Sequence, residues 1–356
     1  MNHRITVSLP PKEGFAYDVL IDRDLRHRAG ELISAVHPLC RVLLLTDDTV
    51  EALYAQDVTA SLQKAGFSVL SHVIPHGEAS KSAENLIALL EKMASEHLTR
   101  ADLLVALGGG VVGDLGGFAA AVYLRGIPFV QMPTTLLAMV DASVGGKTAI
   151  DLAAGKNLCG AFHQPSLVLC DTACPDTLPP EILADGMAEV IKYAFISDRT
   201  LFHTLQGHSP DLSEIIRLSV EDKRALVEAD ETDRGLRQLL NLGHTVGHAI
   251  EACSDFAISH GSAVAMGMVI ITRAAERMGV CEAGTLRALI ALLERYHLPT
   301  RCPFTTEQLF AVALSDKKRA GGSITLVVPY GVADSRLVTI PVDALEGYIR
   351  AGLTED

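Results

Sequence analysis

The stretch "DLLVALGGGVVGD", residues 102–114, joins a short apolar run to a glycine-rich turn. The apolar run at 102–107 has the composition of a buried β-strand. Gly108, Gly110 and Gly113 match the pattern G-x-G-x-x-G, in which glycines let the backbone approach a pyrophosphate at the start of a helix. A glycine-rich turn after a strand is also a common tight turn, so this motif alone leaves both dinucleotide binding and a purely structural role open.

Similar apolar runs flank this strand and predict its neighbours in a sheet. They lie at 41–46, 67–74 and 127–132, with helical stretches between them. Continuous apolar strands that alternate with helices are typical of a parallel sheet covered on both faces. After 171–180 strand-like runs nearly vanish until "SITLVVP" near 323–329. We therefore predict a Rossmann-like α/β domain over 1–174, followed by a mostly α-helical domain over 175–356.

Composition limits the partners of this chain. Its 356 residues carry a net charge of −13, which argues against binding to nucleic acid or to an anionic membrane. Seven cysteines without C-x-x-C spacing suggest reduced thiols. The N-terminus has no signal-peptide core, and no apolar run reaches the ~20 residues of a membrane span. These features predict a cytoplasmic protein whose partner is a small molecule.

The stretch "VDASVGGKTAID", residues 140–151, contains the last three residues of a P-loop, Gly146-Lys147-Thr148. The first glycine of that motif is replaced by Asp141, which would repel a phosphate. ATP hydrolysis is therefore excluded. Lys147 and Lys156 each follow a glycine, and this favours an anionic ligand over the alternative of two solvated lysines in a flexible loop.

The stretch "NLGHTVGHAIE", residues 241–251, places His244 and His248 one helical turn apart on the same face. His260 and Glu189 are further candidate ligands. Histidines with one carboxylate suit a catalytic zinc or a similar divalent ion, whereas the glutamate of H-E-x-x-H is missing, which argues against a zinc protease. Hydrogen-bonded structural histidines remain an alternative.

Taken together and in this order, the motifs resemble those of the 3-dehydroquinate synthase family of sugar-phosphate cyclases. The likeness covers nearly the whole chain. It is carried by "HGEASK" (76–81), "GGGVVGDLGGFAAAVYLRGI" (108–127), "PTTLLAMVDASVGGKTAID" (133–151), "GKNLCGAFHQP" (155–165), "LPPEILADGMAEVIKYAFI" (178–196), "GLRQLLNLGHTVGHAIE" (235–251), "SHGSAVAMGM" (259–268) and "DKK" (316–318).

The resemblance implies a phosphate-eliminating lyase with its active site between an NAD-binding domain and a metal-binding domain. The substrate would be 3-deoxy-D-arabino-heptulosonate 7-phosphate, and the products 3-dehydroquinate and phosphate. In this family NAD takes hydride from the C5 hydroxyl and returns it after phosphate has been eliminated, and an intramolecular aldol reaction closes the ring. The resemblance also implies a homodimer, in which Arg125 reaches the site of the neighbouring subunit.

The resemblance further assigns residues to roles. A divalent metal, zinc or cobalt, would be held by Glu189, His244 and His260, and His248 would act beside it. The implied substrate residues are Asp141, Lys147, Asn157, Lys192, Lys223, Asp233, Arg237, Asn241 and Lys317 or Lys318. The implied NAD residues are Asp47, Glu78, Lys81, Gly109, Gly110, Val111, Asp114, Thr134, Thr135, Asp141, Lys147, Lys156 and Thr177.

One residue and one stretch of the chain depart from the family pattern. Asp233 stands where the family usually has a glutamate, which is one methylene longer, and "SITLVVP" differs from the usual strand.

Three other functions are alternatives to 3-dehydroquinate synthesis. They are a related cyclase that forms a cyclitol, a metal-dependent polyol dehydrogenase that consumes NAD, and a non-catalytic NAD-binding regulator. Retention of Arg237, Asn241 and "DKK" favours the dehydroquinate-forming enzyme, and the intact lysine and metal positions argue against the regulator.

Overall fold

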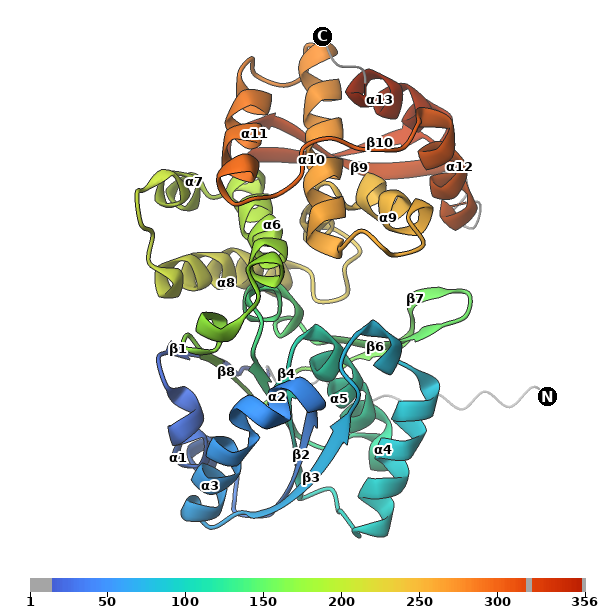
Figure 1. Ribbon diagram of the computed structural model, residues 1–356. Helices are drawn as coiled ribbons and strands as arrows, with labels where there is room; N and C mark the ends of the chain where they lie inside the picture. The colour runs from blue at the N-terminus through green and yellow to red at the C-terminus, as the bar shows by residue number, and fades with distance from the viewer. Residues whose placement is uncertain (1–14, 318–321, 354–356) are drawn as a thin grey trace, which may run out of the picture.

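The computed structural model describes residues 15–317 and 322–353, and it confirms the predicted fold class. Figure 1 shows a sheet with its covering helices in the lower half and a helix-rich part above it. The two halves join through the segment that leads from the last strand of the sheet, β8 (Leu167–Asp171), into α6 (Pro180–Ile196).

The sheet has six parallel strands in the order β1-β8-β5-β4-β2-β3. The four predicted strands are confirmed, whereas β1 and β8 are not among them. Because all six strands run in one direction, their carboxyl ends share one edge of the sheet, with Gly108 opposite Pro133 and Asp22 opposite Asp171. The strands other than β8 are β1 (Asp18–Asp22), β2 (Arg41–Asp47), β3 (Ser68–Ile74), β4 (Leu103–Gly108) and β5 (Phe129–Pro133).

Helices cover both faces of the sheet, and alternate residues of the central strands pack against different helices. In β2, Val42 and Leu44 belong to the core under α1 and α3, whereas Leu43 and Leu45 belong to the core under α4 and α5. Burial on both faces is the reason why β2 and β4 are apolar over most of their length. The covering helices are α1 (Ala29–Val36), α2 (Asp48–Val50), α3 (Gln56–Ala65), α4 (Ala83–Ser95) and α5 (Gly110–Val122).

An antiparallel hairpin separates β5 from β8 in the sequence. Its strands are β6 (Lys147–Leu152) and β7 (Gly155–Phe162). Gly145 and Gly146 precede it with φ of 92° and 67°, which glycine adopts without strain. Lys147 lies on β6 and Lys156 on β7. The alternative that placed both lysines in a flexible loop is therefore wrong about their secondary structure.

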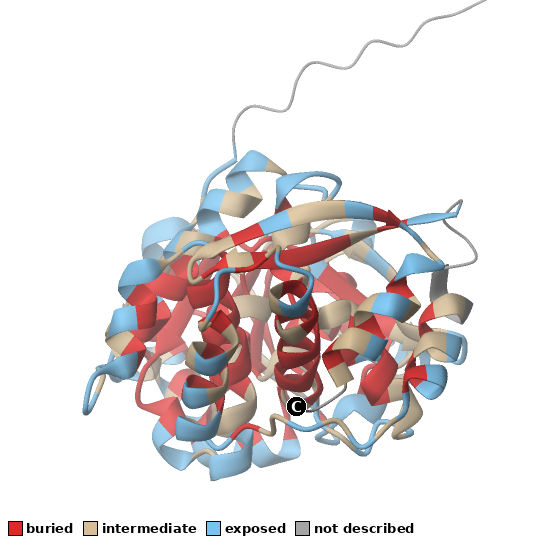
Figure 2. Cartoon of the chain, turned by 90° about the horizontal axis from the view of Figure 1, so that it is seen from above, coloured by how far each residue is buried: buried red, intermediate tan, exposed pale blue. Residues whose placement is uncertain are grey.

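The C-terminal half is built around α10 (His260–Arg277), most of whose residues are buried. In the view of Figure 2, buried residues fill the interior and exposed residues lie at the periphery. The other elements described after α6 are α7 (Arg199–Gln206), α8 (Leu212–Ala229), the 3-10 helix η7 (Leu236–Asn241), α9 (His244–Cys253), α11 (Thr285–Arg295), α12 (Thr306–Lys317), β9 (Ser323–Gly331), β10 (Asp334–Pro341) and α13 (Ala344–Leu353).

Glycines bring the start of α9 against α10. A Cβ on Gly267 of α10 would lie 2.1 Å from the carbonyl oxygen of Gly243, and Gly243 itself has a φ of 79°. Any side chain at Gly267 would force the two segments apart, because core packing leaves no spare space. This close approach carries His244, the first residue of α9, to the neighbourhood of His260, the first residue of α10.

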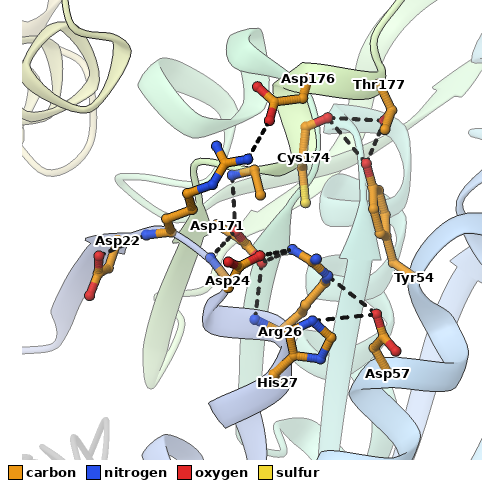
Figure 3. A network of polar contacts seen from close by, with 12 residues as sticks. Asp22, Asp24, Arg26, His27, Tyr54, Asp57, Asp171, Cys174, Asp176 and Thr177 are labelled. Atoms are coloured by element: carbon orange, nitrogen blue, oxygen red, sulfur yellow. Dashed lines mark hydrogen bonds and ion pairs between the residues drawn. The ribbon is translucent and has the colours of Figure 1, made fainter.

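A polar network fixes the segment that follows β8 (Figure 3). Arg26 donates to the buried carboxylate of Asp171 (2.9 Å) and to Asp57 (3.3 Å). Tyr54 donates to the carbonyl of Cys174 (3.1 Å) and contacts the hydroxyl of Thr177. The network thus holds the chain between the sheet and α6 in one position.

Two sequence predictions, on the cysteines and on membrane spans, can be compared with residues 15–317 and 322–353. All seven cysteines lie there, and none forms a disulfide. Among the helices of residues 15–317 and 322–353, none is long and apolar enough to cross a membrane.

Candidate active site

One carboxylate and two imidazoles from three helices meet between the two halves of the chain. Glu189 lies in α6 and is fully buried. Its Oε1 atom is 3.4 Å from Nε2 of His244 and 3.4 Å from Nε2 of His260. The three candidate ligand atoms lie within 4.8 Å of one another. One carboxylate with two histidines leaves open coordination positions, as in a catalytic zinc site.

The other ring nitrogen of each histidine has an acceptor that fixes its proton. Nδ1 of His244 donates to the carbonyl of Leu242 (3.1 Å), and Nδ1 of His260 lies 3.2 Å from the carboxylate of Glu251. In a neutral ring with Nδ1 protonated, each Nε2 can offer its lone pair to a metal ion beside Glu189. Oε1 of Glu189 is buried and has no hydrogen-bond partner among the described residues, whereas Oε2 forms an ion pair with Lys192, so a metal ion would complete the environment of Oε1.

Neighbouring side chains keep the buried carboxyl group of Glu189 ionised. Burial opposes its ionisation, but the Lys192 ammonium, which forms an ion pair with it, and the two histidines outweigh burial and hold its pKa well below the usual value. Glu251 is ionised for a related reason. Burial again opposes the charge, but the hydrogen bond from His260 dominates and lowers the pKa of Glu251 to about 2.

His248 lies one turn after His244, with the two ring centroids 5.5 Å apart. It is exposed and does not belong to the group around Glu189. A second group of candidate ligand atoms comprises His248, Glu251 and His260. Spacing along the helix alone would pair His244 with His248, whereas the fold pairs His244 with His260.

Two buried lysines converge on Asp141, which lies in the π-helical turn η5 (Ala138–Ala142). Lys223 of α8 donates to Oδ1 and to the main-chain oxygen of Asp141, and Lys192 of α6 lies 3.7 Å from Oδ2. Both lysines are at most 5% exposed. Burial lowers the pKa of Lys223, because it disfavours the ammonium more than Asp141 stabilises it. Lys192 also pairs with Glu189, so this cluster is continuous with the candidate metal site.

A second cationic group faces the same region from the hairpin and from the segment before α9. Lys147 of β6 forms an ion pair with Asp233, so the aspartate reaches this lysine although it is shorter than the usual glutamate. Arg237 is buried and donates to the main-chain oxygens of Gly145 (3.0 Å) and Glu231 (2.6 Å). Its Nε atom and Oδ1 of Asp233 are buried and have no hydrogen-bond partner in the described part of the chain. Asn241 ends η7 nearby in the sequence.

The carboxyl edge of the sheet brings the glycine-rich turn to the "PTT" segment. Gly109 precedes α5, and Gly110 and Val111 begin it, so free backbone N–H groups of the helix lie at this edge. A Cβ on Gly109 would lie 3.2 Å from Cγ2 of Thr135. The hydroxyl of Thr134 is buried without a hydrogen-bond partner among residues 15–317 and 322–353. This edge can therefore accept a polar, anionic group.

A buried lysine joins predicted cofactor and substrate residues. Lys81, which follows the turn that contains Glu78, donates to Asp114 (2.5 Å) and to Asn157. Burial raises the pKa of Asp114 to about 6, although Lys81 opposes the shift. Nearby on β7, Lys156 lies 3.4 Å from Glu251 of α9.

Several predicted residues do not join these clusters. Asp47 caps α2 through hydrogen bonds from the N–H groups of Thr49 (3.0 Å) and Val50 (2.9 Å), so the structure shows a local role for it. Arg125 lies in η4 (Tyr123–Arg125) after the C-terminus of α5, at the edge of the sheet opposite to the glycine-rich turn. Lys318 lies outside the described residues. Lys317 ends α12, and its side chain is likewise outside them.

Sequence reasoning missed two residues of the site, Glu251 and Tyr193. Glu251 lies on the face of α9 that carries His244 and His248, so helical periodicity could have identified it. Tyr193 is buried beside Lys192, and its hydroxyl donates to the main-chain oxygen of Val140 (3.1 Å) and lies 3.4 Å from Asp141. No local pattern in the sequence indicates that second contact.

Comparison with known sequences gives two adjacent family matches. Residues 71–185 match the family described as 3-dehydroquinate synthase N-terminal, and residues 186–319 match 3-dehydroquinate synthase C-terminal. The chain is 41% identical over 354 residues to the 3-dehydroquinate synthase of Enterococcus faecalis, covering 97% of this chain and 98% of that protein. It is 46% identical over 337 residues to the 3-dehydroquinate synthase of Caulobacter vibrioides, covering 90% and 91%.

Solved structures agree with these matches. The 2-epi-5-epi-valiolone synthase from Streptomyces hygroscopicus, solved with NAD+ and Zn2+ bound, superposes with a TM-score of 0.88 at 28% identity, covering 98% of both chains. A 2-deoxy-scyllo-inosose synthase has a TM-score of 0.84 at 24% identity over 95% of this chain and 97% of that one, which shows the fold alone. An iron-containing alcohol dehydrogenase shares the fold more distantly, with a TM-score of 0.66 at 15% identity over 95% and 97% of the two chains.

Proposed function

The chain belongs to the 3-dehydroquinate synthase family, and we propose that it converts 3-deoxy-D-arabino-heptulosonate 7-phosphate to 3-dehydroquinate and phosphate. The observation that carries this proposal is the buried Glu189 carboxylate, whose Oε1 faces Nε2 of His244 and His260 while its Oε2 forms an ion pair with the buried Lys192. The proposal includes an NAD-binding domain over 1–174 and a metal-binding domain over 175–356.

The residues present fit both cofactors. We propose that Glu189, His244 and His260 hold a zinc or cobalt ion, because one carboxylate with two imidazoles suits such an ion and Oε1 of Glu189 has no hydrogen-bond partner among the described residues. We propose that NAD binds at the glycine-rich turn, where α5 begins after Gly109 and the buried hydroxyl of Thr134 has no hydrogen-bond partner in the described part of the chain. When bound, NAD accepts and returns a hydride, and the ion polarises the hydroxyl that is oxidised.

The lysines and the arginine of the site would bind the anionic substrate. The protein carries a net charge of −13, so a local excess of cations is needed to attract a phosphate and a carboxylate. Lys147 is half-exposed and forms the solvent-accessible part of this cluster, whereas Lys192 and Lys223 are buried. We propose that Lys147 contacts the substrate from the hairpin side and that Arg237 orients Gly145 in front of β6.

His248 has the features of a proton carrier. Its ring lies 5.5 Å from that of His244 and 6.0 Å from that of His260, and it is exposed, so substrate can reach it. An imidazole that is not a metal ligand can take and return protons near neutral pH. We propose that His248 serves the proton transfers of phosphate elimination and ring closure.

We also propose that the chain forms a homodimer. Arg125 lies at the edge of the sheet opposite to its own site, and the residue before it, Leu124, is an exposed apolar side chain. A residue placed there can serve a site only from a neighbouring copy. The molar mass in solution tests this proposal, and a monomeric enzyme with full activity would contradict it.

Phosphate release tests the proposed function. The metal-loaded protein should release phosphate from the heptulosonate phosphate in many turnovers per NAD, with no net formation of NADH. Sedoheptulose 7-phosphate and glycerol serve as control substrates. Turnover of sedoheptulose 7-phosphate alone would indicate a cyclitol-forming cyclase, and NADH formed in proportion to product would indicate a polyol dehydrogenase.

A further inference from the structure

A buried carboxylate that belongs to no predicted site lies behind the candidate metal ligands. Glu251 is 4% exposed and lies on α9, three residues after His248. Burying a carboxylate is unfavourable unless each oxygen finds a partner. The two oxygens of Glu251 have different partners, which come from different parts of the chain.

The first partner is a proposed metal ligand. Oε2 of Glu251 lies 3.2 Å from Nδ1 of His260, and Nε2 of the same ring lies 3.4 Å from Glu189. A carboxylate here accepts a hydrogen bond from Nδ1–H, so it selects the tautomer whose Nε2 lone pair is free for an ion. A hydrogen bond from the outer nitrogen of a ligating histidine also fixes the ring plane and raises its basicity.

The second partner comes from the hairpin. Oε1 of Glu251 lies 3.4 Å from Nζ of Lys156, which also lies 4.6 Å from the ring centroid of Phe256. Lys156 and Glu251 are 95 positions apart in the sequence, so this contact spans the two halves of the chain. Lys156 thus holds the carboxylate in place while the other oxygen faces His260.

We infer that Glu251 is a positioning residue of the metal site: it fixes the tautomer and the ring orientation of His260, and Lys156 anchors it from the hairpin. This inference rests on the proposed function, because it needs Glu189, His244 and His260 to hold the metal. Glu251 itself would not touch the ion or the substrate.

Metal affinity of the full-length protein tests the inference without reference to turnover. Metal-free protein is titrated with Zn2+ for the dissociation constant and with Co2+ for the visible absorption spectrum. Glu251→Ala should weaken Zn2+ binding by roughly 10- to 100-fold and alter the Co2+ spectrum. Glu251→Gln should lie between this variant and the wild type, because its amide oxygen can still accept from Nδ1 but carries no charge.

Matched variants separate positioning from other roles. Glu276→Gln makes the same change at the end of α10, where the carboxylate accepts the N–H of Leu286 (2.7 Å), and it should bind metal like the wild type. Lys156→Met should weaken metal binding less than Glu251→Ala. Circular dichroism checks the fold, and Glu251→Gln, which keeps the shape of the side chain, carries the test if Glu251→Ala does not fold.

Three outcomes would overturn the inference. The first is wild-type affinity with an unchanged Co2+ spectrum in both Glu251 variants. The second is an equal loss in Lys156→Met and Glu251→Ala, which would make the ion pair alone responsible. The third is two ions per wild-type chain and one in Glu251→Ala, which would make Glu251 a ligand in a second site with His248. In each case wild-type phosphate release would leave the proposed function standing, whereas a wild type without metal binding and phosphate release would refute that function.

Discussion

Replacing His260 by alanine should abolish tight metal binding together with turnover, whereas replacing His248 should spare the metal and lower turnover by roughly 10²–10⁴-fold. The reason is the geometry of the three helix segments. Nε2 of His260 lies 3.4 Å from Glu189, as does Nε2 of His244, whereas His248 is exposed and outside this group. With three protein ligands, loss of one removes a large part of the coordination shell.

The measurement is the metal content of the purified variants beside their rate of phosphate release. His297→Ala is a control, because this histidine lies after α11 and outside both groups of candidate ligand atoms. It should match the wild type in both respects. A metal-free His248→Ala variant together with a metal-replete His260→Ala variant would reverse the proposed ligand assignment.

Replacing Asp141 by asparagine should lower the free energy of unfolding by about 3 kcal/mol, because it leaves a buried ammonium without its counter-charge. Lys223 is 5% exposed, and its ion pair is with Asp141. Lys192 is less affected, since Glu189 also pairs with it. Urea denaturation of the metal-free protein measures the difference.

The loss should also depend on pH. Burial lowers the pKa of Lys223 in the wild type, and loss of the Asp141 charge should lower it further. A lysine whose pKa is lower in the folded state destabilises the fold most at low pH, where it must stay charged. The penalty diminishes as the pH rises through the folded pKa towards the unfolded value. The destabilisation by Asp141→Asn should therefore be larger at neutral than at alkaline pH.

Two further variants give this prediction its controls. Adding Lys223→Met to Asp141→Asn removes the unpaired charge and should restore more than half of the lost stability. Lys147→Ala breaks a half-exposed ion pair with Asp233, so it should change stability by less than about 1 kcal/mol while it lowers turnover. Equal stability of Asp141→Asn and the wild type at neutral pH would show that Lys223 needs no counter-charge.

Much of the N-terminal half could be predicted from the sequence. The apolar runs at 41–46 and 102–107 became β2 and β4, because strands buried on both faces must be apolar throughout. Gly108–Gly110 was correctly placed at the start of a helix. The edge strand β1 was not predicted, because it is short, both of its end residues are exposed and its three central residues are only half-buried. The strands β6 and β7 were not predicted, because partly exposed hairpin strands have no long continuous apolar run.

In the candidate site, too, some features could be predicted from the sequence and others depend on the tertiary structure. The sequence by itself determined that His244 and His248 share a helix face and that a glycine-rich turn follows a strand, since both depend on residues a few positions apart. The tertiary structure decided that His260, and not His248, joins Glu189, and that Lys156 meets Glu251. Local periodicity is fixed by neighbouring residues, whereas these contacts depend on how α6, α9, α10 and the hairpin strand β7 pack. The close approach of Gly267 to Gly243 sets part of that packing, and its effect on His244 and His260 appears only once the helices are placed in space.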